Sequence, residues 1–431
     1  MKMSSTTWPT LPIKNIYKGL YDGPHATPRP AVKGPIFLGI KNVTEDGQLD
    51  LVNVRHIAED DFADWTRRVQ PQENDLVFTY EATLNRYALI PDGFRGCLGR
   101  RMALIRPNLE VVDVKYLFYY FFTDEWRSVI RNNMLSGSTV DRIPLTGFPD
   151  FPVRIPPLPT QRRIAGILSA YDDLIENSQR RIKILEEMAR RLYREWFVYF
   201  RFPGHEGCRL VDSPLGEIPE GWEVKTLNDV AEDIVDYRGK TPTKLGGEWS
   251  DTGIIALSAL NVKGGRLVNL EKSKRVEEDL FARWMKNPLR QGDILMTSEA
   301  PLGELFFLCR HERYCLSQRL FSIRADRKAI SSIILYFNLE SEQTQHELRS
   351  RASGSTVSGI RQSELRNVPL IIPSLDIQVR AERILQQLAE QIHTLDVQIQ
   401  NLRSTRDLLL PRLLSGQIDV EALPEPGLSQ P

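Results

Sequence analysis

Apolar residues recur in alternating steps of four and three along two long stretches of the chain, and prolines precede both stretches. The first pattern runs from Ile164 to Trp196 and the second from Ala381 to Leu413. Such a heptad pattern places its apolar side chains on one stripe of a single helix. Two helices of about 40 residues are therefore expected, each about 60 Å long at 1.5 Å per residue.

Each stripe is longer than the surface of one globular domain, so each helix is expected to pack on another long helix. The period of 3.5 residues predicts a left-handed coiled coil of the two helices. If they run antiparallel, an approximate two-fold axis relates the two halves of the chain. The alternative is that each helix packs only on its own domain. The predicted seam comprises Ile164, Leu168, Tyr171, Ile175, Ile182, Leu185, Leu192, Leu385, Leu388, Ile392, Leu395, Ile399, Leu402 and Leu409.

The second stripe departs from the first at two kinds of position. Leu395 occupies the slot that Ser178 fills in the first stripe, whereas Arg406 stands where an apolar residue is expected. Gln391 and Gln398 lie beside this stripe. The second helix is therefore expected to make less regular apolar contacts than the first.

The same series of motifs occurs twice, at a shift of 217 to 219 residues. The pentapeptide SGSTV begins at Ser136 and again at Ser353. GPIFLGIKNV, from Gly34, aligns with GIIALSALNV, from Gly253, and NDLVFTYEATL aligns with GDILMTSEAPL. Because the shift drifts by only one residue at a time, the chain is predicted to contain two copies of one fold in tandem.

Each copy has the pattern of a mixed α/β domain. Short β-branched or aromatic runs such as DILMT and FSIRA are bounded by Gly, Asp and Pro, which is typical of strands. Residues 114–135 and 328–351 have helical patterns. SGSTV follows each of these as a Gly, Ser and Thr turn that leads back toward the long helix.

Composition places the chain among folded proteins of more than one domain. It has 431 residues, 41% of them hydrophobic, so two or three domains are expected. No apolar run of 18 or more residues occurs, and the N-terminal residues lack the apolar core of a secretion signal. The sequence therefore predicts a cytoplasmic protein.

Several kinds of chemistry are not favoured. The 4 cysteines form no C-x-x-C pair and the 6 histidines are scattered, so no metal site is expected. The GKT at residues 239–241 lacks the first glycine of a phosphate loop, since Ile234 stands there. Glu223, Lys225 and Asp212 loosely resemble a metal-dependent nuclease site, which stays an alternative. No glycine-rich cofactor loop of a methyltransferase is present.

The repeat itself favours binding to a long ligand. Two copies that share a framework but differ in their loops can read two segments of duplex DNA. The formal net charge is zero, and residues 1–157 carry 19 Lys and Arg against 18 Asp and Glu, so a localised basic groove is expected rather than a basic domain.

Candidate DNA contacts were chosen by residue type in corresponding loops, because Arg, Lys, Asn, Gln, Ser and Thr bond base edges and phosphates. The alternative for each is a solvated polar surface. The candidates are Lys41, Asn42, Thr79, Tyr80, Arg86, Arg100 and Arg101 in the first copy, and Lys240, Lys244, Asn261, Ser298, Gln318 and Arg319 in the second.

The tandem arrangement, the segment LPTQRRIAGILSAYDDLIENSQRRIKILEEMARRLYREWFVYFRFPG and the SGSTV before each proline-led helix resemble the specificity (S) subunit of type I restriction-modification systems. The resemblance implies two target recognition domains, each reading one half of a bipartite, asymmetric DNA site. It also implies a subunit without catalytic activity or cofactor. Its partners would be two methylation (M) subunits, which carry S-adenosylmethionine, and restriction (R) subunits in the full complex.

The predicted organisation has six parts. They are a first target recognition domain (1–157), a central long helix (158–202), a linker (203–220), a second target recognition domain (221–373), a distal long helix (374–415) and a flexible tail (416–431). A coiled-coil scaffold without DNA readout is the other alternative.

Overall fold

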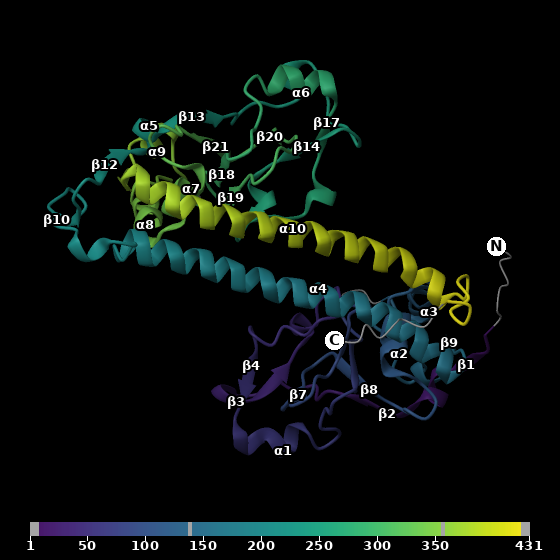
Figure 1. Ribbon diagram of the computed structural model, residues 1–431. Coiled ribbons are helices and arrows are strands. Elements are labelled where there is room, and N and C mark those ends of the chain that lie inside the picture. Colours follow the sequence, from purple (N-terminus) through teal and green to yellow (C-terminus); the bar gives the residue numbers. More distant parts are fainter. Residues whose placement is uncertain (1–7, 137–139, 355–357, 424–431) are drawn as a thin grey trace. The chain divides into compact units, whose positions relative to one another are not determined.

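A computed structural model describes residues 8–136, 140–354 and 358–423 of the chain (Figure 1). Contacts divide the chain into two compact units. Unit 1 combines Met1–Asn177 with Ile399–Pro431, and unit 2 is Ser178–Gln398. Each unit therefore contains one copy of the repeat together with part of each long helix.

Both predicted long helices are present. Helix α4 is Leu158–Tyr193 and helix α10 is Leu375–Leu414 (Figure 1, teal and yellow). Helix α4 ends earlier than the predicted residue 202. A π-helical turn, Arg194–Val198, follows it, and Phe200 has a left-handed φ of 58°, so the backbone leaves the helix before residue 202.

In unit 1, two sheets form the domain. A four-stranded antiparallel sheet has the order β2-β8-β5-β6, and a three-stranded sheet has the order β4-β3-β7, in which β3 and β7 are parallel. The strands are β2 (Tyr17–Asp22), β3 (Pro30–Leu38), β4 (Arg55–Ile57), β5 (Leu76–Thr79), β6 (Tyr87–Leu89), β7 (Gly96–Leu98) and β8 (Met102–Pro107). A short pair, β1 (Thr10–Pro12) and β9 (Pro152–Arg154), joins the ends of the domain.

Unit 2 repeats this topology. Its four-stranded sheet has the order β13-β21-β18-β19, its three-stranded sheet the order β17-β14-β20, and β14 is parallel to β20. The strands are β13 (Ala231–Asp236), β14 (Ile254–Leu257), β17 (Arg275–Val276), β18 (Ile294–Thr297), β19 (Leu305–Phe307), β20 (Cys315–Leu316) and β21 (Leu320–Ala325). The pair β12 (Glu223–Thr226) and β22 (Pro369–Ile372) matches β1 and β9. The predicted tandem repeat of a mixed α/β fold is confirmed.

The helical stretch of each domain is divided in two by a capping hydroxyl. Thr123 accepts a hydrogen bond from the Trp126 N–H, which starts α3 (Asp124–Asn133) after α2 (Val114–Tyr120). In unit 2, Ser341 caps α8 (Glu342–Ser350) after α7 (Ser332–Glu340). The smaller helices are α1 (Phe62–Trp65), α5 (Leu227–Val230), α6 (Glu278–Trp284) and α9 (Gln362–Arg366). Most of each SGSTV, residues 137–139 and 355–357, lies outside the described residues.

Within each unit the long helices run antiparallel. In unit 1, Ile164 and Leu168 near the start of α4 share a buried cluster with Leu413 near the end of α10. In unit 2, Tyr193 near the end of α4 shares a cluster with Leu385 near the start of α10. None of the predicted seam side chains is exposed. Both clusters also include domain residues, so each helix packs on its partner helix and on a domain. The predicted two-fold relation between the copies stays a prediction.

Arg406, the cation in the apolar stripe, has a partner across the seam of unit 1. Its Nη1 donates to Asp172 Oδ1 at 2.5 Å, and the Tyr119 hydroxyl donates to the other oxygen of Asp172 at 2.5 Å. The arginine therefore links α10 to α4, and Tyr119 of α2 holds the same carboxylate. A paired charge of this kind can be accommodated in a half-buried seam.

Residues 416–423 of the predicted flexible tail contact unit 1, and residues 424–431 lie outside the described residues. Val420 is 2% exposed and joins the core of unit 1, and the Thr160 hydroxyl donates to Glu421 Oε1 at 3.0 Å. Arg163 donates to the Leu423 carbonyl oxygen. These contacts hold the segment against the first turns of α4. In unit 2, the predicted linker likewise contains a strand pair, β10 (Leu210–Val211) and β11 (Ile218–Pro219).

Candidate nucleic-acid interface

Several strand ends meet at one edge of each domain. In unit 1, Asp22 at the end of β2 pairs with Ala103, and Thr79 at the end of β5 pairs with Met102. The parallel pairing of β3 with β7 brings residues 39–42 beside residues 99–101, where the Gly99 N–H donates to the Leu38 carbonyl at 2.7 Å.

The same edge forms in unit 2. Asp236 pairs with Phe321, Thr297 pairs with Leu320, and the Ser317 N–H donates to the Leu257 carbonyl at 2.8 Å. We call this the loop edge of each domain. It comprises residues 22–29, 39–42, 80–86, 99–101 and 141–143 in unit 1, and residues 236–244, 258–261, 298–304, 317–319 and 358–361 in unit 2.

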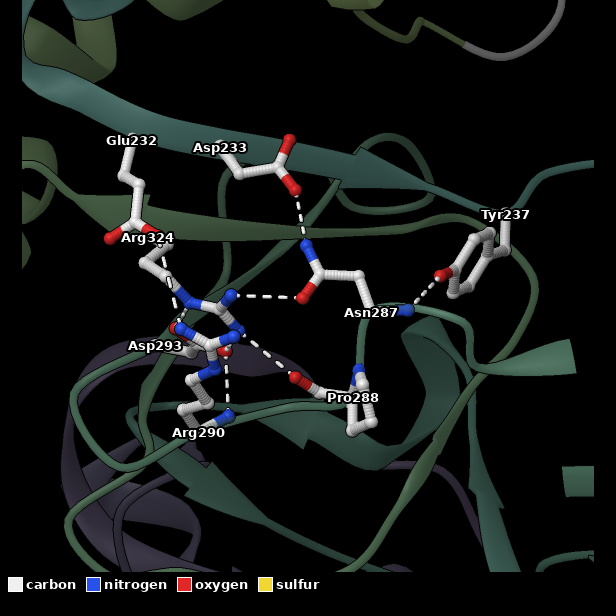
Figure 2. Close-up of polar contacts among 8 residues, drawn as sticks. All are labelled: Glu232, Asp233, Tyr237, Asn287, Pro288, Arg290, Asp293 and Arg324. Carbon is white, nitrogen blue, oxygen red and sulfur yellow. Dashed lines mark hydrogen bonds and ion pairs between the residues drawn. The ribbon is translucent and has the colours of Figure 1, made fainter. Parts of the chain in front are cut away.

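An arginine and an aspartate tie the neighbouring strands of each four-stranded sheet together. Arg106 of β8 donates from Nε and Nη2 to Asp75 at 2.9 and 2.7 Å. Arg324 of β21 donates to Asp293 from the same two atoms, at 2.8 and 2.7 Å (Figure 2). Asn287 adds a contact in unit 2, because Arg324 Nη1 donates to its side-chain oxygen at 2.9 Å. Bidentate pairs of this kind fix geometry as well as adding energy.

A buried glutamine at the start of each long helix fastens the helix to its domain. Gln161 accepts from the Asp113 N–H at 2.9 Å and donates to the Pro156 and Val111 carbonyls at 2.8 and 3.1 Å. Gln378 accepts from the Ser331 N–H at 2.9 Å and donates to two carbonyls at 2.9 and 3.1 Å. The two glutamines therefore make equivalent hydrogen bonds in the two copies.

Asn42 and Asn261 were predicted to contact DNA, and the structure corrects both predictions. They are 6% and 4% exposed. The Gly39 N–H donates to Asn42 Oδ1 at 3.0 Å, and the Ser258 N–H donates to Asn261 Oδ1 at 2.9 Å. Their amide nitrogens donate to backbone carbonyls of neighbouring turns. These side chains shape the loops and have no surface to offer a ligand.

Thr79, Tyr80 and Ser298 are also buried, at 0%, 5% and 0% exposure, so they are corrected for the same reason. Burial raises the pKa of Tyr80 to about 12, and its hydroxyl lies 3.3 Å from His25 Nε2. Thr79 lies on β5 and the other two lie directly after β5 and β18. These three buried side chains therefore pack beneath the surface of the loop edges.

The remaining candidates reach the surface of their domains. Lys41 and Arg100 are exposed in unit 1, as are Lys244, Gln318 and Arg319 in unit 2. Gln318 Nε2 donates to the Lys240 carbonyl at 3.3 Å, which joins two loops of the edge.

Three of the surface cations also make local contacts. Lys244 Nζ donates to the Gly239 carbonyl at 2.8 Å, and Lys240 Nζ lies 4.1 Å from the centre of the Tyr237 ring. Arg86 is half-buried and donates to the Val43 carbonyl and to Glu45, both at 3.2 Å. Arg86 therefore braces a turn, whereas the two lysines lie where a ligand can reach them.

Sequence reasoning missed two arginines that pair with aspartates of the loop edges. Arg68 pairs with Asp22, and Arg238 lies 2.6 Å from Asp236 Oδ2. These aspartates end equivalent strands, but no repeated motif marks them, because the aligned motifs begin later, at Gly34 and Gly253. Matching the strand ends is the signal that would have found them.

Two residues of the alternative nuclease site lie on one strand. Lys225 Nζ lies 2.6 Å from Glu223 Oε2 on β12, so these two nuclease candidates form an ion pair. Within residues 8–136, 140–354 and 358–423, no three or more His, Cys, Asp or Glu residues are grouped to hold a metal ion. No helix in these ranges is both long and apolar enough to span a bilayer. Burial raises the pKa values of Cys97 and Cys315, which occupy equivalent strands, to about 12.

Residues 34–187 and 219–402 match the family described as type I restriction modification DNA specificity domain. The two matches cover more than half of the chain, one in each copy of the repeat. The chain therefore belongs to this family, and the predicted resemblance is confirmed.

Individual relatives agree with this assignment. The chain is 27% identical to the type I restriction enzyme MjaIX specificity subunit of Methanocaldococcus jannaschii over 371 aligned residues. The alignment covers 86% of this chain and 83% of the relative. The chain is 24% identical over 356 residues to the MjaVIII specificity subunit of the same organism, covering 81% and 80%. The crystal structure of the S subunit of a type I restriction-modification system from M. genitalium matches with a TM-score of 0.60 over 96% of this chain and 98% of that chain, at 14% identity, which supports the fold.

Proposed function

We propose that this chain directs a type I restriction-modification complex to a bipartite, asymmetric DNA site, with one loop edge contacting each half of the site. The observation that carries the proposal is the duplication of the framework beneath two different edges. Asp75 with Arg106 corresponds to Asp293 with Arg324, whereas the exposed residues above them differ, as Arg100 and Gln318 do. Two different surfaces on one framework suit two different half-sites.

The residues of the edges suit contact with duplex DNA. Arginine and lysine bind phosphates and guanine, and glutamine bonds adenine. Exposed residues of these types are present at both edges, at Lys41 and Arg100 in one and at Lys244, Gln318 and Arg319 in the other. The edges also carry acidic residues such as Asp22 and Asp236, which is consistent with selective rather than general attraction to the polyanion.

In this proposal the chain has no catalytic activity of its own. Two M subunits dock on it and carry S-adenosylmethionine, and R subunits join them in the full complex. The chain's own contribution is to place the methylation and restriction subunits at a chosen sequence. A coiled-coil scaffold without DNA readout is the competing function, and it predicts methylation without regard to the surface of either domain.

Domain exchange tests the proposal. The chain is purified with its M subunits, and residues 221–373 are replaced by the matching domain of a relative with a known site. Methylation mapping on a sequence library should show that one half of the site changes and the other stays. Replacing residues 8–155 instead is the matched control and should change only the other half. Changes in both halves, or methylation indifferent to either exchange, would contradict independent reading by the two domains.

A further inference from the structure

An arginine and a glutamate meet at the same place on both loop edges. Arg101 Nε lies 3.0 Å from Glu81 Oε1, and Arg319 Nε lies 2.8 Å from Glu299 Oε1. Both glutamates follow the end of a central strand, β5 or β18, and both arginines precede the first residue of β8 or β21. The pair recurs although the loops that surround it differ. Sequence comparison had aligned the glutamates without assigning them a role.

The backbone of both arginines is in the left-handed conformation, which residues other than glycine rarely adopt. The φ values are 70° for Arg101 and 63° for Arg319. The Tyr80 N–H donates to the Arg101 carbonyl at 3.2 Å, and the Ser298 N–H donates to the Arg319 carbonyl at 2.9 Å, which helps to hold this conformation. Strained backbone persists where the surroundings impose it, and it gathers at functional sites. A turn that needed only a left-handed residue would be served better by glycine.

The pairing leaves the outer part of each guanidinium available. In both domains the ion pair involves Nε, and the Nη1 and Nη2 atoms of Arg101 and Arg319 have no hydrogen-bond or ion-pair partner among the described residues. The side chain of Arg319 is 53% exposed, whereas that of Glu299 is 30% exposed. These terminal nitrogens are a fork that can bond guanine O6 and N7, or a phosphate, with two hydrogen bonds.

Backbone contacts fix each glutamate in place. Glu81 forms a β-bridge with Arg142, and Glu299 forms one with Gly359. A Cβ atom added at Gly359 would lie 2.9 Å from the Glu299 Cβ, so the two segments are in close contact. The Arg319 and Glu299 side chains are 53% and 30% exposed, and those of Arg101 and Glu81 are 32% and 18% exposed. Because exposed ion pairs add little to stability, support of the fold alone does not explain why the more exposed pair of the second domain recurs at a strained turn.

We propose that Glu81 and Glu299 are specificity-determining residues of the two loop edges. Each carboxylate holds the adjacent arginine so that its fork faces outward, and its negative charge opposes a phosphate that approaches the same guanidinium. Base edges carry no full negative charge, so the carboxylate penalises phosphate binding more than base binding. The pair thus favours readout of bases over attachment to any DNA. This inference rests on the proposed function, and it adds a role for two acidic residues in discrimination.

The test is the variant Glu299→Gln in the complex with the M subunits. Dissociation constants are measured by fluorescence anisotropy for a duplex with the recognised site and for a scrambled duplex of equal length, over a range of salt concentrations. We expect scrambled DNA to bind about three- to tenfold more tightly, with a salt dependence steeper by about one unit, since a phosphate contact is gained. The ratio of specific to non-specific affinity should fall by the same factor, about three- to tenfold. An unchanged ratio would overturn the inference.

Controls separate this inference from its foundations. Glu278→Gln removes a carboxylate that pairs with Arg313, and this variant should leave the ratio unchanged. Arg313 lies before β20, whereas Arg319 lies after it at the loop edge. If Glu299→Gln does not assemble, Glu81→Gln tests the same role in the other domain. Arg319→Lys retains the charge without the fork, so it should lower specific affinity more than non-specific affinity. A wild-type complex that fails to discriminate between the duplexes would overturn the proposed function itself.

Discussion

The two domains differ most at their loop edges and least in the polar contacts beneath them. Arg106 with Asp75, Gln161 and Asn42 have equivalents in Arg324 with Asp293, Gln378 and Asn261, down to the atoms that bond. At the edges, the equivalent exposed position is occupied by Arg100 in the first copy and by Gln318 in the second. A buried polar group must keep its partner, whereas an exposed side chain can vary at little cost. This difference teaches which positions build the domain and which are free to set its ligand.

The shared framework is not equally buried in the two domains. The Arg324 side chain is 9% exposed and that of Arg106 is 28% exposed. Asn287 contributes in unit 2, where it accepts from Arg324 and also donates to Asp233 (Figure 2). Val69 holds the equivalent place in unit 1. The second domain therefore depends more strongly on its arginine than the first.

Replacing this arginine should have the largest effect. Arg324→Met leaves Asp293, which is 1% exposed, without its partner, and we expect a loss of about 3–5 kcal/mol in the free energy of unfolding of the second domain. Arg106→Met should cost the first domain less, because water reaches that pair. Hydrogen exchange of strand amides in the full chain reports each domain separately. Equal losses in the two domains would contradict the difference in burial.

The glutamines should behave alike. Gln161→Ala and Gln378→Ala each leave one backbone N–H and two carbonyls without partners, so we expect a loss of about 2–3 kcal/mol in the corresponding domain. The same hydrogen-exchange measurement compares the two. Gln386 of α10, whose Nε2 donates to Glu390 Oε1 at 3.1 Å, is the control, and Gln386→Ala should change stability by less than about 0.5 kcal/mol. If only one of the two buried glutamines mattered, the framework would not be truly duplicated.

The C-terminal segment should stabilise unit 1 selectively. Val420→Ala removes two buried methyl groups next to α4, and we expect a loss of about 1–2 kcal/mol, seen as faster hydrogen exchange in unit 1 but not in unit 2. Leu423→Ala, at a residue that is 37% exposed, is the matched control and should be nearly silent. An equally silent Val420→Ala would restore the prediction of a flexible tail.

Changing an edge residue should have the smallest effect on stability. Arg100→Gln gives the first domain the side chain that the second has at Gln318, and we expect unfolding to change by less than about 0.5 kcal/mol. DNA binding by the complex should lose about one unit of salt dependence if Arg100 holds a phosphate. Thermal unfolding and binding at several salt concentrations check the two parts. A large loss of stability would place Arg100 in the framework instead.

The sequence by itself determined the repeat, the two long helices and the family. Heptad spacing and repeated motifs are patterns along the chain, so they need no knowledge of folding. Residue type did not reveal burial, however, and Asn42, Asn261 and Thr79 were assigned wrongly to the surface. They were chosen by residue type in corresponding loops, whereas their burial shows that these three side chains belong to the framework.

Only the tertiary structure decided which loops meet and what the exceptional residues contact. The pairing of Asp22 with Ala103 and of Thr79 with Met102 brings segments distant in sequence to one edge. Arg406 pairs with Asp172, which lies 234 positions away along the chain. Val420 is buried in the core of unit 1, although the Pro- and Gly-rich sequence around it did not indicate burial. Such contacts depend on how separate elements pack, and packing is a property of the folded chain that no local pattern contains.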